Sequence, residues 1–215
     1  MLQIIPMVLG SVATNTYLIA DDGTGETAVI DPAWDGQAIL TEAQKHGWHI
    51  GQIWITHAHF DHFAGAPAIL AGSKPHATLA LHPADLPLWH MKGGAAWFGI
   101  EITTAAQPDI LLNEAQVLRV GQYEFEVRHT PGHSPGHVIY YCAAEGLAFC
   151  GDTVFAGSIG RSDLPGGNEE ILLNSIHSQI LTLPEATHLL SGHGEETSVG
   201  IEKKTNLFLR KYRAG

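Results

Sequence analysis

Four short segments of this chain carry clustered histidines and aspartates, and each one follows an apolar stretch that is typical of a strand. The segments are residues 56–62, 130–137, 151–153 and 191–194. The chain has 14 histidines among its 215 residues, and neutral imidazole is the commonest metal ligand in proteins. This pattern predicts a metal site assembled from four separate loops.

The first segment, 56–62, has the sequence THAHFDH and follows a short buried strand. In an extended loop, His57 and His59 point to the same side, and Asp61 and His62 are expected to begin the next helix. Four such side chains would crowd one ion, so they favour two neighbouring ions that are completed from elsewhere in the chain. The alternative is an exposed polar loop whose histidines bind no metal.

The second segment, TPGHSPGH at 130–137, combines glycines and prolines in a rigid turn that presents His133. His137 is the ambiguous member of this segment. It is either a further ligand or, as we expect, a hydrogen-bonded histidine that supports the site from a strand. His129, just before the turn, is expected to be a surface or structural histidine.

In the third and fourth segments, one metal-binding side chain follows an apolar strand and a glycine. These side chains are Asp152, after Gly151, and His193, after Gly192. A carboxylate at the end of a buried strand is costly unless it is paired or binds a metal, and its two oxygens can bridge two cations. Asp152 could otherwise serve as a helix cap or turn residue. A lone histidine such as His193 is more often structural, and only its combination with the other three segments indicates a metal ligand.

Composition narrows the class of protein. The formal net charge is −11 with 11 Lys and Arg residues, which argues against a nucleic-acid partner. No apolar run approaches the roughly 20 residues of a membrane span, and no charged leader precedes the apolar N-terminus. Cys142 and Cys150 lie in apolar runs and are expected to be buried free thiols. We therefore expect a cytoplasmic protein without a membrane partner, and leave the oligomeric state open.

Alternating strand and helix patterns predict an α/β fold, and the lack of a linker predicts a single domain over residues 1–215. Helices are expected over 36–46, 62–72, 83–91, 168–182 and 199–212. Strands are expected over 2–9, 15–20, 26–30, 53–55, 77–81, 116–120, 123–128, 137–142, 147–150 and 187–191. Residues 93–107 are expected to form a loop over the site.

Taken together, the motifs resemble those of the metallo-β-lactamase superfamily. That family's motifs are matched in order by Asp31, His57-x-His59-x-Asp61-His62, His133, Asp152 and His193. The resemblance implies a four-layer αββα sandwich, with the metals at one edge between the two sheets.

The resemblance also implies a role for each residue. One ion would be bound by His57, His59 and His133, and the other by Asp61, His62 and His193. Asp152 would bridge the two ions, and Asp31 would hydrogen-bond the metal-binding loop. Zinc is the expected metal, with iron or manganese as alternatives.

Within the superfamily, the chain is similar to the compact glyoxalase II group, the hydroxyacylglutathione hydrolases. The similarity lies in TPGHSPGH and in GDTVFAGSIGRSD at 151–163. It implies cleavage of acyl thioesters such as S-D-lactoylglutathione by a hydroxide between two ions, with Asp61 and Asp152 as catalytic residues. The partner would be a small-molecule thioester.

The chain departs from longer glyoxalase II enzymes in two respects. One helix is expected after His193 in place of their C-terminal helical domain, and Gly160-Arg161-Ser162-Asp163 replaces their lysine-and-tyrosine glutathione contact. Arg161 is therefore expected either to bind a substrate carboxylate or to form a salt bridge with Asp163.

Three other functions stay open. The first is a mononuclear iron persulfide dioxygenase, a related class in which a Gly-Arg-Ser/Thr-Asp turn also occurs. The second is a hydrolase of another ester, such as a lactone or a phosphodiester. The third is a metal-binding module without catalysis, which would have a closed coordination shell.

Overall fold

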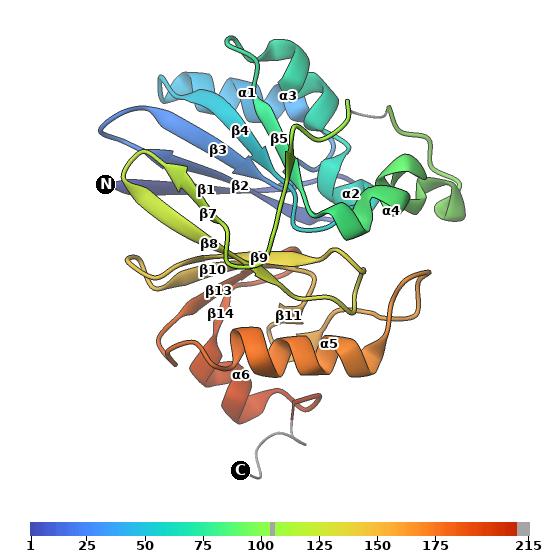
Figure 1. Cartoon of the computed structure of the whole chain (residues 1–215). Helices are drawn as coiled ribbons and strands as arrows, with labels where there is room; N and C mark the ends of the chain where they lie inside the picture. The colour runs from blue at the N-terminus through green and yellow to red at the C-terminus, as the bar shows by residue number, and fades with distance from the viewer. Residues whose placement is uncertain (104–105, 210–215) are drawn as a thin grey trace.

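The computed structural model describes residues 1–103 and 106–209, which form four layers (Figure 1). Helices α1 (Gly36–Lys45) and α3 (Ala66–Gly72) cover the first sheet, above it in Figure 1. Helices α5 (Glu169–Ser175) and α6 (Val199–Thr205) cover the second sheet from below. The expected αββα sandwich is confirmed.

The first sheet has the strand order β1-β2-β3-β4-β5-β6. Its strands are Leu2–Leu9 (β1), Thr14–Asp21 (β2), Glu26–Ile30 (β3), His49–Trp54 (β4), Thr78–Leu81 (β5) and Ile110–Leu111 (β6). The first three strands are antiparallel, and β3 to β6 are parallel. Parallel strands end at the same edge of a sheet, and functional groups gather outside these carboxyl ends. The THAHFDH segment follows β4 at this edge.

The second sheet has the order β14-β13-β10-β9-β8-β7. Its strands are Thr197–Ser198 (β14), His188–Ser191 (β13), Leu147–Gly151 (β10), Val138–Cys142 (β9), Tyr123–His129 (β8) and Val117–Val120 (β7). Strands β10 and β13 are parallel, so Asp152 and His193, which follow them, emerge at one edge. A small hairpin of Val154–Phe155 (β11) and Ser158–Ile159 (β12) continues from β10.

The core is divided by the two sheets. Successive side chains of a strand point to opposite faces, and β2 is buried on both. Leu18 packs with the residues of α1 and α3, whereas Tyr17 packs with the residues of the second sheet. A third cluster, which includes Leu172 and Val199, lies between the second sheet and its helices. The fully buried strands therefore fix the relative position of the two edges at which the site forms.

The predicted helix over 62–72 is wrong as a single element, because the structure has α2 (Phe60–Phe63) and α3. The break falls at Gly65, whose backbone N–H bonds the carbonyl of Pro32 at 2.8 Å. A Cβ at Gly65 would lie 2.6 Å from the carbonyl oxygen of Trp34. This close backbone approach requires a glycine and interrupts the helix.

Several other boundaries differ from the prediction. The helix expected at 83–91 is a 3₁₀ turn, Pro83–Asp85 (η1), followed by α4 (Leu86–His90), and the helix expected at 168–182 is α5 followed by a π-helical turn, Ile176–Ile180 (η3). The loop expected at 93–107 contains a 3₁₀ segment, Lys92–Phe98 (η2), and its residues 104–105 lie outside the described residues. The helix expected at 199–212 ends at Thr205, and its residues 210–212 lie outside the described residues.

Two findings bear on the expectations from composition. Cys142 and Cys150 are buried free thiols, as expected. Among the described residues, no helix combines the length and the apolar character needed to cross a membrane.

Candidate metal centre

The structure brings the seven predicted metal ligands together at one edge, between the two sheets. Three of them form a first group: His57, His59 and His133. The Nε2 atom of His133 lies 2.8 Å from Nδ1 of His59 and 3.1 Å from Nε2 of His57. All three residues are buried, and three of their ring nitrogens converge on one point.

A second group consists of Asp61, His62 and His193. Oδ2 of Asp61 lies 3.4 Å from Nε2 of both His62 and His193. Asp61 and His62 lie on α2, immediately after the loop that carries His57 and His59. Oδ2 of Asp61 also accepts a hydrogen bond from the hydroxyl of Thr14 at 3.0 Å.

Asp152 lies between the two groups. Its Oδ2 atom is 3.6 Å from Nε2 of His133 and 3.6 Å from Nε2 of His193. A Cβ at Gly192 would lie 2.2 Å from Oδ1 of Asp152, so the close approach of this turn requires a glycine.

Hydrogen bonds on the far side of four rings set which ring nitrogen faces the site. The Nδ1 atom of His62 lies 2.9 Å from a carboxylate oxygen of Asp31, which can act only as an acceptor, so Nδ1 carries the proton. The same argument applies to His133 and His193, whose Nδ1 atoms face the carbonyls of Arg161 and Ala13. The Nδ1 atom of His57 faces the hydroxyl of Thr56, which donates its own proton to Asp31 and therefore accepts from the ring. Each of these rings therefore directs its Nε2 atom towards the site, where it is free to bind a metal once it carries no proton.

These observations test whether the site fits divalent cations. Within the described residues, Nε2 of His62 and Oδ1 of Asp152 are buried and have no hydrogen-bond partner. Burial lowers the pKa of His57, as do its neighbouring histidines, so that its ring stays neutral. Burial raises the pKa of Asp152, but the charges of His62 and His133 outweigh it and hold that pKa well below its usual value. Imidazole nitrogens around an ionised carboxylate are a donor set that fits divalent metals.

Asp31 supports the site as the resemblance implies. Its carboxylate accepts hydrogen bonds from the backbone N–H of Thr56 at 2.7 Å and from the Thr56 hydroxyl at 2.6 Å, in addition to His62. It thereby fixes the start of the THAHFDH loop and the orientation of one ring.

His137 does not join either group of ligands. Its Nε2 atom accepts the backbone N–H of Asp152 at 3.0 Å, and its Nδ1 atom lies 2.8 Å from the Thr130 hydroxyl. It lies just before β9 and is fully buried. The geometry agrees with the expected supporting histidine. His129 is partly buried and stacks on His82, with ring centroids 4.1 Å apart.

Sequence reasoning missed Asp85, a buried residue that supports the site. This carboxylate is fully buried and bonds to both histidine-bearing loops of the first group. Its sequence neighbours predict a short helix and offer no local signal, because its bonding partners lie 27 to 51 residues away.

The site opens into a cavity of about 210 Å³. Its polar lining comes from the ligand groups and from Arg161, and its apolar lining is Val12, Phe60, Phe98, Ile100 and Leu164. The Arg161 side chain is half-exposed and pairs with both carboxylate oxygens of Asp163, at 2.7 and 2.8 Å. The structure therefore contains the salt bridge that was one of the two expectations for Arg161, while its carbonyl orients His133.

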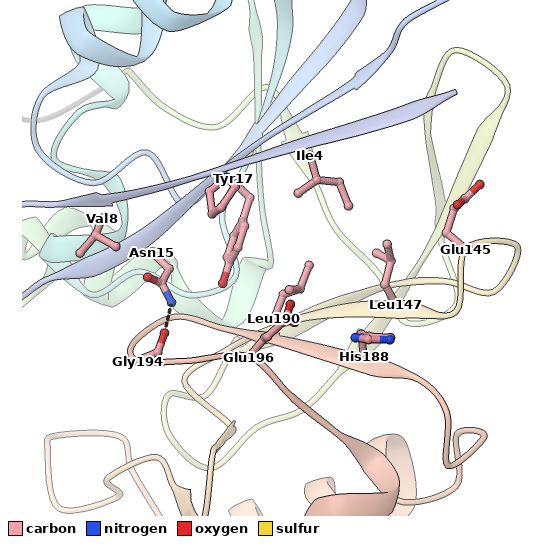
Figure 2. Close-up of a pocket in the computed structure, with 11 residues that line it drawn as sticks. Ile4, Val8, Asn15, Tyr17, Glu145, Leu147, His188, Leu190, Gly194 and Glu196 are labelled. Carbon is pink, nitrogen blue, oxygen red and sulfur yellow. Dashed lines mark hydrogen bonds between the residues drawn. The ribbon is translucent and has the colours of Figure 1, made fainter.

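A larger cleft of about 550 Å³ lies between β1 and β2 of the first sheet and β10 and β13 of the second (Figure 2). Ile4 and Tyr17 point into it from one sheet, and Leu147 and Leu190 line it from the other. One end of the cleft contacts the site, because Asn15 Nδ2 donates to the carbonyl of Gly194 at 2.9 Å, beside His193 in the chain. The predicted ligands do not line this cleft, so the smaller cavity is the candidate active site.

Two relatives with assigned names match almost the whole chain. The probable metallo-hydrolase YqgX of Bacillus subtilis is 40% identical over 210 residues, covering 96% of this chain and 97% of that protein. Hydroxyacylglutathione hydrolase GloC of Haemophilus influenzae is 32% identical over 213 residues, covering 97% of each.

Two solved structures share the fold at similar identity. The BLEG-1 B3 metallo-beta-lactamase has a TM-score of 0.88 and 38% identity, covering 96% of this chain and 99% of that one. TTHA1623 in a di-iron-bound form has a TM-score of 0.86 and 36% identity, covering 95% and 100%. The family model described as the metallo-beta-lactamase superfamily matches residues 9–193. The family model covers most of this chain, and the chain covers 97% of each of the two relatives. The chain therefore belongs to the metallo-β-lactamase superfamily of metal-dependent hydrolases.

Proposed function

We propose that this protein hydrolyses acyl thioesters with the help of two divalent ions. The observation that carries the proposal is the position of the Asp152 carboxylate, at 3.6 Å from a ring nitrogen of each ligand group. The first group would hold one ion, the second group would hold the other, and Asp152 would contact both. Ions bound there would supply Lewis acidity and an ionised water molecule at neutral pH.

The residues of the chain contribute charge, orientation and exclusion of water. Burial raises the pKa of Asp61, but His62 and His193 outweigh burial and lower it to about 2. Asp61 is therefore ionised at neutral pH, and a carboxylate oxygen can accept a hydrogen bond from a water molecule and orient it towards the substrate. The apolar wall formed by Val12, Phe98 and Ile100 suits the acyl part of a substrate and limits access of bulk water.

The metal is proposed to be zinc, with iron or manganese as alternatives. A donor set rich in imidazole accepts each of these ions, and selection depends on geometry and supply. The di-iron form of TTHA1623 supports iron as the first alternative.

The substrate class rests on the relatives. The name of the Haemophilus influenzae relative supports a hydroxyacylglutathione thioester such as S-D-lactoylglutathione. Arg161 is the one arginine or lysine among the described residues that line the cavity, and it would pair with a substrate carboxylate, although Asp163 partly neutralises its charge. The B3 metallo-β-lactamase similarity adds β-lactams to the substrates that need testing.

The test joins metal analysis with a substrate panel on one sample purified without chelator. We expect about two ions per chain and cleavage of thioesters in preference to lactones, phosphodiesters and β-lactams. Oxygen uptake with glutathione persulfide is measured on the same sample. Rapid oxygen uptake without cleavage of any thioester would instead identify a mononuclear iron dioxygenase, and binding of metal without any turnover would identify a binding module.

A further inference from the structure

Asp85 is a carboxylate with no exposed surface, at the junction between the 3₁₀ turn η1 and helix α4. Its Oδ2 atom accepts hydrogen bonds from the Ala58 backbone N–H at 2.8 Å and from the Ser134 hydroxyl at 2.7 Å. Its Oδ1 atom accepts the backbone N–H of Gly136 at 2.6 Å. Each partner is a neutral donor, and these three hydrogen bonds offset part of the cost of burying the charge.

The partners of Asp85 belong to the two loops that supply the first ligand group. Ala58 lies between His57 and His59, and Ser134 directly follows His133. One carboxylate thus joins two loops that are distant in the chain, since His59 and His133 are 74 positions apart. Holding these loops together holds the Nδ1 atom of His59 within 2.8 Å of the Nε2 atom of His133.

Asp31 performs a matching task on the other side of the site. Its hydrogen bonds go to Thr56 and to His62, a member of the second ligand group. Within the described residues, the hydrogen bonds of Asp85 reach neither Asp61, His62 nor His193. The two buried carboxylates therefore support different ligand groups. The one exception is His57 of the first group, which contacts Thr56, a hydrogen-bond partner of Asp31.

We infer that Asp85 is the positioning residue of the ligand group His57, His59 and His133, and that it controls the affinity of one metal ion independently of the other. The inference rests on the proposed two-ion function. Supporting partners of metal ligands typically change metal affinity by about 10- to 100-fold when they are removed. Loss of Asp85 should therefore weaken the ion of the first group and leave the ion of the second group in place.

The test measures metal affinity directly. The full chain is stripped of metal and titrated with Zn²⁺ against a chromophoric chelator, for the original protein and for Asp85→Asn. An asparagine cannot accept all three hydrogen bonds, because its NH₂ group would face a donor. We expect one of the two binding steps to weaken by about 10- to 100-fold and the other to change by less than about threefold.

Two backgrounds identify which ion is affected. His193→Ala retains the first ligand group intact, and His133→Ala retains the second. Adding Asp85→Asn should weaken the remaining ion in the His193→Ala background and leave it unchanged in the His133→Ala background. Equal weakening in both backgrounds, or no weakening in the first, would overturn the inference.

A matched control separates positioning from general stability. Asp21 is another buried carboxylate that joins two turns, through the backbone N–H groups of Gly23 and Gln122, at the opposite end of β2 from Thr14. Asp21→Asn should lower the unfolding midpoint without changing either metal affinity. If Asp85→Asn fails to fold, Ser134→Ala serves instead, because it removes only one of the three hydrogen bonds of Asp85. It should lower the affinity for the ion of the first group by a smaller factor. An unchanged affinity in Ser134→Ala would also contradict the inference.

These outcomes are separable from the proposed function. An original protein that binds a single ion would refute the two-ion proposal, while the His193→Ala background would still test Asp85. An original protein that binds two ions, with Asp85→Asn indifferent to both, would refute the inference about Asp85 alone.

Discussion

The Nε2 atom of His137 accepts a hydrogen bond from the backbone N–H of Asp152 at 3.0 Å. Because this nitrogen is an acceptor, the proton of the neutral ring lies on Nδ1, which donates to the Thr130 hydroxyl at 2.8 Å. His137 therefore fixes the backbone of Asp152, the residue whose carboxylate lies between the two ligand groups. His137 itself belongs to neither group.

This relationship predicts that removing the acceptor at His137 weakens both ions together, in contrast to Asp85. His137→Leu should lower both affinities by about 10-fold or more, the range found for supporting partners. His137→Gln can still offer an oxygen to the Asp152 N–H and should lower them less. Chelator competition with both variants provides the measurement, and similar affinities for the Leu and Gln variants would show that the acceptor is unimportant.

Replacement of Asp152 should be more damaging than loss of any one histidine. Asp152→Ala removes the negative charge between the two groups and exposes two cations to each other, so we expect loss of at least one ion and of nearly all turnover. His57→Ala and His193→Ala should each weaken one ion and retain the other. Elemental analysis and thioester cleavage on the three variants in parallel give the answer. Full metal occupancy with near-normal turnover in Asp152→Ala would rule out the bridging role.

The four ligand segments could be predicted from the sequence because each carries a local signature. Histidines, glycines and an aspartate directly follow apolar strands, and the parallel pairing of β10 with β13 brings two of these segments to one edge. Asp85 lacks such a signature, since its partners are distant in the chain. The part of Arg161 that orients His133 is a backbone carbonyl, which every residue type provides.

The limits of fold prediction have similar physical causes. Strands β6, β11, β12 and β14 have two residues each, too few to show an alternating pattern. The break between α2 and α3 at Gly65 depends on contact with Pro32 and Trp34, which a local helical pattern does not reveal. Longer elements such as β1 and α1 were predicted within about two residues, the usual uncertainty of element ends.

The metal-free protein should lose stability as the pH falls below about 6.5, the pKa of an unfolded histidine. Burial and neighbouring histidines lower the pKa of His57 and His137 well below this value, and lower that of His59 to about 3. The unfolded chain then binds protons that the folded chain does not, which costs about 1.4 kcal/mol per pH unit for each such histidine.

Histidines whose pKa values are raised by folding affect the stability of the folded protein above pH 6.5. Burial lowers the pKa of His62, but Asp61 and Asp152 outweigh it and raise that pKa well above 6.5. His62 is protonated in both states below pH 6.5, so its stabilisation is lost only as the pH rises above that value. Urea unfolding in the presence of a chelator should therefore show a maximum near pH 6.5. His137→Gln should flatten the acid side of this maximum, and a flat profile between about pH 5 and 6.5 in the original protein would contradict the prediction.

The Arg161–Asp163 pair predicts opposite effects of two substitutions on the binding of anionic substrates. The guanidinium lies at the mouth of the cavity, and both of its bonds go to the Asp163 carboxylate, whose pKa they lower to about 2. Arg161→Ala should raise KM for an anionic thioester, because it removes the positive charge. Asp163→Asn should lower KM for the same substrate, because it releases the guanidinium from its partner. Each change should be at most about fivefold, since the pair is exposed and screened by solvent.

An uncharged alkyl thioester serves as the control substrate, and its KM should be unchanged in both variants. Metal content should also be unchanged, because the bond to His133 Nδ1 comes from the Arg161 carbonyl, which the Ala variant keeps. Steady-state kinetics on both substrates, with metal analysis of each sample, separate these effects. If Arg161→Ala changed kcat or metal content while leaving KM for the anionic thioester unaltered, the side chain would serve the structure of the turn and not the binding of substrate.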